Sequence, residues 1–149
     1  SAHNYSVNVF STVSFRASVT GAFEPIPFGG ERWDIGGLHD PVTNNSRITV
    51  PAGGAGIWGI GFNIQEDVRI NLADRLLFRI LVSGTATRGI EISLGSTAHN
   101  PAASFYSEYD LSSGNYVEIG MYAVTNSDDG TLAGSDLSAF VMDWLRSTP

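Results

Sequence analysis

Residues 33–56 read WDIGGLHDPVTNNSRITVPAGGAG, and this stretch decides between an enzyme and a structural module. It places Asp34, His39 and Asp40 close together. Histidine and carboxylate can bind Zn²⁺, and carboxylates with loop carbonyls can bind Ca²⁺. The spacing matches no metal-binding motif, however, and aspartate commonly accepts hydrogen bonds from backbone N–H groups in turns. We therefore expect Asp34 and Asp40 to stabilise turns, and we keep a metal-dependent hydrolase as the lowest-ranked alternative.

The glycine-rich end of this stretch, PAGGAG at residues 51–56, resembles a phosphate-binding loop only superficially. A P-loop needs a lysine, and the chain contains none. A dinucleotide-binding loop needs a helix after it, whereas the residues from Trp58 onward alternate as in a strand. The segment is therefore predicted to be a tight corner that leads into a strand.

The dominant periodicity of the sequence is two, which is typical of β-strands with one buried face. Segments rich in Gly, Asn and Pro separate the alternating rows and predict turns. Glu66-Asp67 is likewise interpreted as a turn. Many short strands with such turns indicate an all-β sandwich or barrel. The apolar rows begin at Val13 (with Phe15, Ala17 and Val19), Ile48, Trp58, Leu76, Ile90 and Val117.

The segment SDLSAFVMDWLRS near the C-terminus is ambiguous. Leu137, Phe140, Val141, Trp144 and Leu145 recur at helical spacing after a possible N-cap, yet alternate residues also fit a strand. The choice for Asp136 to Leu145 is close to even, and the all-β context favours a strand.

Composition excludes several classes of function. The chain has 149 residues, which suits one domain, residues 1–149, with residues 1–12 as an extended N-terminal arm. Its net charge is −7 and its basic residues are all arginine, which disfavours nucleic acid and anionic membrane as partners. No cysteine is present, no apolar run is long enough to insert into a membrane, and no signal peptide is recognised.

Aromatic residues suggest surfaces for contact. Tyr116 and Tyr122 lie on the face of their strand opposite to the apolar row, so they predict a second buried surface, most simply a subunit interface. Trp144 lies in an apolar row that fits the core, and we also assign it to the trimer interface. Tyr106 and Tyr109 are candidates for contact with a ligand or receptor, such as a glycan.

Other polar residues are given ordinary roles. The acidic residues Asp128, Asp129 and Asp136 could hold a calcium ion, but a solvated loop is the more common outcome. His3 and His99 are interpreted as isolated histidines in polar loops.

The opening stretch carries a fixed order of short motifs, namely Trp33-Asp34, Gly36-Gly37, His39-Asp40, Asn44-Asn45, Arg47 to Pro51, Gly53 to Gly56 and Trp58. This order resembles the complement C1q-like domain, one of the tumour-necrosis-factor-like jelly rolls, and especially its versions in bacteriophage and bacterial structural proteins. Two later segments agree: SSGNYVEIGMYA, with Asn115 where the family usually has Asp, and SAFVMDWL as a closing strand.

This resemblance implies a ten-stranded, two-sheet antiparallel jelly roll that forms a homotrimer and carries no catalytic residues. Some members of the family bind Ca²⁺, but no ligands can be assigned to it in this chain. The expected function is that of a non-catalytic virion surface protein, namely a phage capsid decoration, head fibre or tail-fibre tip. Its expected partners are a capsid or tail protein and a host surface glycan. The alternative is a soluble bacterial carbohydrate- or ligand-binding module.

Overall fold

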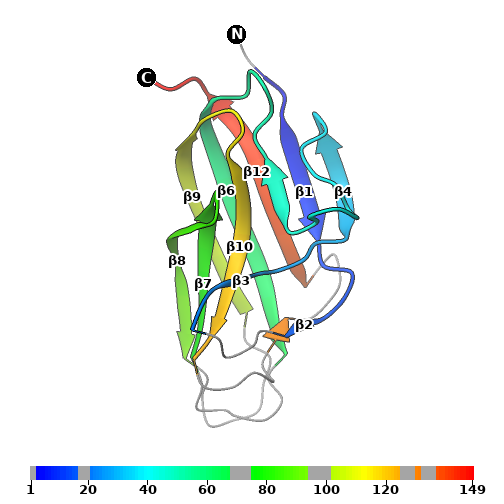
Figure 1. The fold of residues 1–149 in the computed structure, drawn as a ribbon, viewed down its shortest axis with the longest axis vertical. Coiled ribbons are helices and arrows are strands. Elements are labelled where there is room, and N and C mark those ends of the chain that lie inside the picture. Colours follow the sequence, from blue (N-terminus) through cyan, green and yellow to red (C-terminus); the bar gives the residue numbers. More distant parts are fainter. Residues whose placement is uncertain (1–2, 17–20, 68–74, 94–101, 125–129, 132–136) are drawn as a thin grey trace.

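The computed structural model describes residues 3–16, 21–67, 75–93, 102–124, 130–131 and 137–149. Its strands form two antiparallel sheets that pack face to face (Figure 1). Within these residues no helix occurs, so none could cross a membrane. The predicted all-β, two-sheet architecture is confirmed.

The first sheet contains the long strand β6 (Gly56–Asp67), which has neighbours on both sides. On one side β6 pairs with β9 (Ala102–Leu111). On the other side the order continues through β12 (Ser138–Arg146), β1 (Ser6–Phe10) and β4 (Gly30–Ile35). The far end of β6 pairs with β11 (Gly130–Thr131), which pairs in turn with β2 (Phe15–Arg16).

The second sheet is organised around β10 (Tyr116–Ala123) and β7 (Arg75–Val82), which pair along almost their whole length. Strand β8 (Thr85–Ser93) forms a hairpin with β7. The short strands β3 (Glu24–Pro25) and β5 (Arg47–Thr49) pair with opposite ends of β10.

The core lies between the sheets and is built from the alternating rows that the sequence predicts. In β6 the side chains of Trp58, Ile60 and Ile64 are fully buried, and in β10 those of Val117 and Ile119 are. Burial of an aliphatic or aromatic side chain contributes about 1.5–3 kcal/mol, so these rows supply much of the stability of the fold.

The C-terminal segment forms a strand, as favoured over the helix. Strand β12 lies between β1 and β6, where Phe140 pairs with Phe62 and with Val9. Phe140 and Met142 are fully buried, because the strand alternation turns both toward the core.

Three expectations are corrected at the N-terminal end and in β6. Residues 6–10, assigned to an arm, form β1 inside the first sheet, where Val7 and Val9 are fully buried. The row expected from Val13 fails at its first member, because Val13 is 57% exposed, whereas Phe15 packs partly buried against the core and the last two members lie outside the described residues. Glu66 and Asp67 are not in a turn but in β6, where they pair with β11.

The two ends of the described chain lie side by side. Ser6 in β1 pairs with Asp143 in β12, and the Trp144 backbone N–H donates to the Tyr5 carbonyl at 3.0 Å. Both termini therefore leave the same end of the sandwich (Figure 1).

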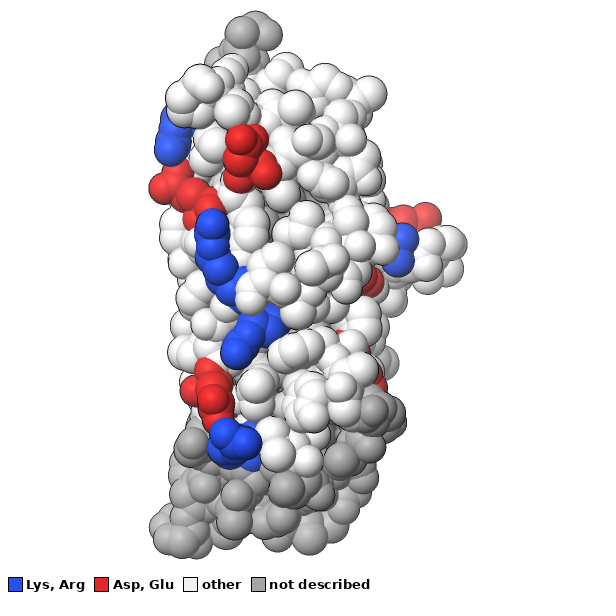
Figure 2. Space-filling view, turned by 60° about the vertical axis from the view of Figure 1, so that its left-hand side comes forward, with Lys and Arg blue, Asp and Glu red and all other residues white. Residues whose placement is uncertain are grey.

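Charged side chains form a column along the side of the molecule that carries β8 and β9 (Figure 2). Opposite charges pair within this region, with Arg75 2.9 Å from Glu91 and Arg146 2.8 Å from Glu108. All four side chains are substantially exposed, so each pair adds little to stability.

Candidate functional site

The two aspartates of the opening stretch serve turns, as predicted. The two carboxylate oxygens of Asp34 accept the backbone N–H groups of Leu38 at 2.8 Å and His39 at 3.0 Å. One oxygen of Asp40 accepts those of Val42 at 2.9 Å and Thr43 at 3.0 Å. No cluster of three metal-ligating side chains occurs among the described residues. These contacts leave the hydrolase hypothesis without support.

The hydrogen bonds to Asp40 also affect its ionisation. Donation from the Thr43 N–H, and then from the Val42 N–H, lowers the pKa of the Asp40 carboxyl from its ordinary value, because both bonds favour the charged form. Asp40 is therefore an exposed carboxylate at neutral pH. Its second oxygen accepts no hydrogen bond from the described residues.

His39, which the opening stretch places beside two aspartates, is held at both ring nitrogens. Nδ1 lies 2.8 Å from Glu31 Oε1, and Nε2 lies 2.9 Å from the Asn45 carbonyl oxygen. The His39 side chain is fully buried. A carbonyl oxygen only accepts, so Nε2 carries a hydrogen. His39 thus ties β4 to the loop before β5, which is a structural role.

A polar hollow of about 500 Å³ opens beside this loop. Its wall contains Asp40 and Arg47, which lie near each other because the loop between them folds back before β5. The remaining lining residues are Gly37, Leu38, His39, Thr43, Asn44 and Thr49. Sequence reasoning did not identify this hollow, since no periodic pattern marks it.

The PAGGAG segment is the predicted corner. Gly54 donates its N–H to the Pro51 carbonyl at 2.9 Å, and Gly53 has a φ of 78° that suits glycine. The Trp58 indole N–H donates to the Gly54 carbonyl at 2.9 Å. The corner therefore anchors the first aromatic side chain of β6 and does not precede a helix.

Asn115, which stands where the resemblance leads one to expect an aspartate, occupies the turn before β10. Its side-chain oxygen accepts the Ser112 N–H at 2.8 Å, and its amide donates to Ser83 Oγ at 3.3 Å. An amide can perform both roles at once, whereas a carboxylate could only accept.

The residues predicted for a trimer interface are partly covered by their own chain. The Arg47 guanidinium carbon lies 4.0 Å from the centre of the Tyr116 ring, and Phe23 packs on Tyr122 with ring centres 5.4 Å apart. Both tyrosines are half-buried. Their role between subunits stays a prediction.

Trp144 lies at the end of the sandwich near the chain termini. Its indole N–H donates to the Ala55 carbonyl at 3.3 Å, and His3 packs edge-on against it with ring centres 4.8 Å apart. His3 also stacks on Tyr5 at 5.0 Å, so the expectation of an isolated histidine was wrong. The interface role of Trp144 stays a prediction.

The two tyrosines proposed for ligand contact have different environments. Tyr106 is 60% exposed, whereas Tyr109 is only 8% exposed and belongs to the core. The Tyr109 hydroxyl lies 2.7 Å from Thr87 Oγ1 and accepts the Arg88 N–H at 3.2 Å, which links β9 to β8 across the two sheets. Of the pair, Tyr106 is therefore the residue presented to solvent.

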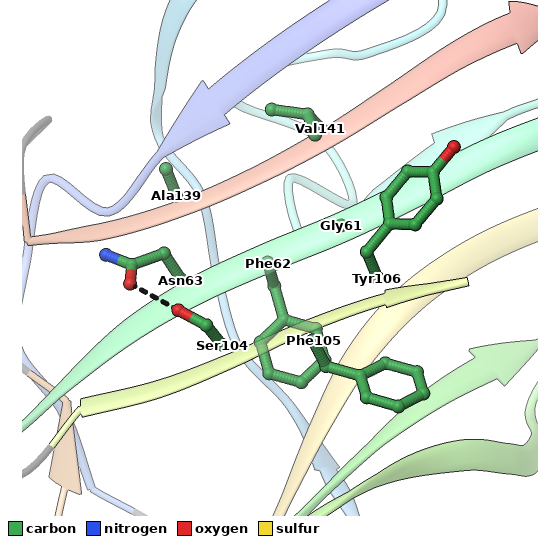
Figure 3. Close-up of a pocket in the computed structure, with 8 residues that line it drawn as sticks. All are labelled: Gly61, Phe62, Asn63, Ser104, Phe105, Tyr106, Ala139 and Val141. Atoms are coloured by element: carbon green, nitrogen blue, oxygen red, sulfur yellow. Dashed lines mark hydrogen bonds between the residues drawn. The ribbon is translucent and has the colours of Figure 1, made fainter.

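Tyr106 lies flat on the outer face of the first sheet. A side chain at Gly59 of the neighbouring strand would displace it, since a Cβ there would be 3.1 Å from its ring, whereas a Cβ at Gly61 would only touch it at 3.4 Å. Beside it, Ser104 donates a hydrogen bond to Asn63 at 2.8 Å, while Val141 of β12 lies across β6 (Figure 3).

This part of the sheet is hollowed by about 450 Å³, with a mainly apolar lining. The same outer face continues to β4, where Trp33 is 45% exposed and Ile35 is 52% exposed. The register of β4, β1 and β12 places both on this face, because paired residues in antiparallel strands share a side. We call this surface the Tyr106 face.

The acidic group at Asp128, Asp129 and Asp136, considered for calcium, lies outside the described residues, as does His99. The possibility of a calcium site at these aspartates therefore stays untested.

The fold is that of solved C1q-like and tumour-necrosis-factor-like domains. The globular domain of a zebrafish complement 1qA protein matches 97% of this chain over 99% of its own length, with a TM-score of 0.68 and 14% sequence identity. Murine APRIL at pH 5.0 matches 96% of this chain over its full length, with a TM-score of 0.69 and 9% identity. No protein-family profile matches the sequence, and no curated protein does.

Proposed function

We propose that this C1q/TNF-like jelly roll is a non-catalytic module that assembles as a homotrimer and acts by surface contact on the outside of a virus particle. The observation that carries the assembly is the Tyr106 face. It presents three large apolar side chains, Trp33, Ile35 and Tyr106, each 45% exposed or more. Exposed apolar side chains that share one face of a sheet are found at interfaces on soluble proteins.

The shape of the Tyr106 face also suits a protein partner. Gly59 and Gly61 add no side chains to the outer surface of β6, and the ring of Tyr106 lies over them. Apolar surfaces that carry an exposed aromatic side chain are typical of subunit contacts. We therefore propose the Tyr106 face as a subunit interface, while the role of Tyr116 and Tyr122 between subunits stays a prediction.

Binding is favoured over catalysis because the residues with catalytic potential are occupied by structural contacts. Asp34 binds two backbone N–H groups, and His39 is fully buried between Glu31 and Asn45. A general base needs access to a substrate proton, which these contacts deny.

The test of assembly is mass measurement by light scattering. It is made first on the parent chain and then on a variant that carries an added charge on the Tyr106 face. We expect a trimer for the parent chain and a monomer for Val141→Arg. Val42→Arg is the matched control, because Val42 is 84% exposed in a loop outside this face. A parent chain that is monomeric at every concentration would overturn the assembly proposal.

The virion location is supported by the likeness of residues 33–58 to phage versions of this domain. Its test is peptide mass spectrometry on purified particles from the source of the gene. The protein is expected at a fixed ratio to the capsid or tail protein, and its absence from particles would refute this location.

A soluble carbohydrate-binding module is the second candidate. The exposed ring of Tyr106 beside Asn63 and Ser104 offers the stacking surface and polar groups that a sugar needs. Glycan-array binding that is lost in Tyr106→Ala while the trimer persists would favour this candidate. Tyr109→Ala is unsuitable for the test, because Tyr109 is a core residue.

A further inference from the structure

The polar hollow beside Arg47 contains hydrogen-bonding groups that the fold itself does not use. Arg47 Nε is buried and has no hydrogen-bond partner among the described residues. The nearest carboxylate oxygen, Glu118 Oε2, is 3.9 Å from it, which is an ion pair but too long for a hydrogen bond. Buried donors without partners are uncommon in folded proteins, so this one calls for an explanation.

Other described arginines show the contrast. Arg75, Arg79, Arg88 and Arg146 each donate at least one hydrogen bond to an oxygen of the chain. Arg88 is the closest match to Arg47, because its guanidinium also lies over a tyrosine, 4.4 Å from the centre of the Tyr109 ring. Arg88 nevertheless bonds Ser107 Oγ at 2.9 Å and the Glu108 carbonyl.

Arg47 is held in place although its donors are unused. It packs over Tyr116 at 4.0 Å, and the carboxylate of Glu118 is fixed by a hydrogen bond from the Ser46 hydroxyl. Stacking on an aromatic ring restrains a guanidinium while its edge stays available for an acceptor. The side chain is thus pre-ordered for a ligand, which reduces the entropy lost on binding.

Asp40 offers the complementary group. One of its oxygens is used by the turn, and the other accepts no hydrogen bond from the described residues. Both Asp40 and Arg47 line the same hollow of about 500 Å³, which is within the usual range for small-ligand sites. The hollow therefore combines a partly exposed guanidinium that makes no hydrogen bond to the described residues with a carboxylate oxygen that accepts none from them.

A ligand that satisfies both must donate and accept. A hydroxyl group does both, whereas a carboxylate or phosphate only accepts and would face the charge of Asp40. The charge of Arg47 is already offset by the buried Glu118, and the whole chain carries −7, so anions are disfavoured.

We propose that the hollow between Asp40 and Arg47 binds a neutral sugar through two adjacent hydroxyl groups, one accepting from Arg47 and one donating to Asp40. The inference rests on the proposed adhesive function and gives it a ligand. It does not use the Tyr106 face, because Arg47 belongs to β5 of the second sheet. The site can therefore stay open in an assembled particle.

The test is saturation-transfer NMR of the full chain with the methyl glycosides of mannose, glucose, galactose and N-acetylglucosamine, and with N-acetylneuraminic acid as an acidic comparison. A single shallow site is expected to bind one neutral glycoside with a Kd of about 1 mM. Asp40→Asn and Arg47→Gln are each expected to weaken this binding about tenfold or more, and Arg88→Gln to leave it unchanged.

Two features keep this test decisive. Arg47→Gln leaves the buried Glu118 without its cation and can unfold the chain, whereas Asp40→Asn keeps an oxygen for the Val42 and Thr43 N–H groups. Thermal unfolding shows whether each variant is folded. If Arg47→Gln does not fold, the binding measured for Asp40→Asn alone decides the test. Light scattering on the same samples separates failure of assembly from failure of sugar binding.

The proposal is overturned by any of three results. These are no transfer to any neutral glycoside of the panel, transfer to N-acetylneuraminic acid alone, and transfer that persists unchanged in Asp40→Asn. Binding that is lost in Tyr106→Ala but kept in Asp40→Asn would also overturn it, since the sugar would then lie on the Tyr106 face.

Discussion

At the scale of single residues, Asp34 and His39 are used to shape the chain. Asp34 fixes the backbone of the next turn through both carboxylate oxygens. The general tendency of aspartate to do this made the role predictable from sequence. What the sequence could not reveal was the pairing of His39 with Glu31 and Asn45, because those contacts depend on how β4 and the loop meet in space.

Asp34→Ala is expected to lower the free energy of unfolding by about 1–3 kcal/mol, because the Leu38 and His39 N–H groups lose their acceptors. Asp34→Asn keeps one side-chain oxygen and should lose less. Urea unfolding monitored by tryptophan fluorescence measures both. Equal stability of Asp34→Ala and the parent chain would contradict the role of this carboxylate.

Asp40 gives a prediction about pH. Its carboxyl is expected to titrate below its ordinary pKa of 3.8, because the Thr43 and Val42 N–H groups stabilise the charged form. A pKa that is lower in the folded than in the unfolded chain adds stability at pH values above the unfolded pKa. That stability is lost as the pH falls through the folded pKa. Carboxyl-detected NMR measures the titration, and a midpoint at or above the ordinary value would refute it.

At the scale of elements, the alternating rows predicted β6, β7 and β10 well, because both ends of each row are buried by the opposite sheet. Alternation of apolar residues did not predict a buried face where a strand pairs over only two residues. Residues 15–16 pair only with β11, so Val13 stays exposed despite its regular spacing. Ile26 and Phe28 were missed for the opposite reason. They are fully buried next to prolines, where the sequence indicated a turn.

The β7–β8 hairpin depends on a glycine. A Cβ at Gly89 would strike the Phe78 carbonyl and lie 2.8 Å from Arg79 Cα, both of which are backbone atoms that cannot move aside cheaply. Gly89→Ala is therefore expected to destabilise the chain by about 3 kcal/mol or more. Gly61→Ala is the control, since its Cβ would make ordinary side-chain contacts at 3.4 Å and lose less. Thermal unfolding compares the two, and equal losses would contradict this view of the hairpin.

At the scale of the whole molecule, sequence reasoning reached the architecture but not the surfaces. The order of turns and apolar rows is set along the chain and can be read from it, and it led to the jelly roll that solved domains share. The Tyr106 face arises where strands far apart in the sequence meet, and the hollow at Arg47 arises where residues 37–49 fold back on themselves. A periodic pattern of apolar residues does not report how such residues meet in space.

If the Tyr106 face is an interface, stability should depend on protein concentration. A trimer that forms only from folded chains shifts the unfolding equilibrium by mass action, so the Tm of the parent chain is expected to rise with concentration. Val141→Arg should remove this dependence, and Val42→Arg should retain it. Differential scanning calorimetry over a wide concentration range measures the effect. A Tm that does not change with concentration in the parent chain would argue against assembly.

The adjacency of the chain ends has a mechanical consequence. Because Ser6 pairs with Asp143 at the same pole from which both ends leave, a pull between the ends would open the β1–β12 ladder one residue pair at a time. Antiparallel hydrogen bonds run perpendicular to their strands, so such a pull loads them singly and not together. The domain should therefore resist tension poorly when it is stretched between its own termini. It should resist force far better when both termini are fixed at one pole and the force acts on the faces of the sandwich.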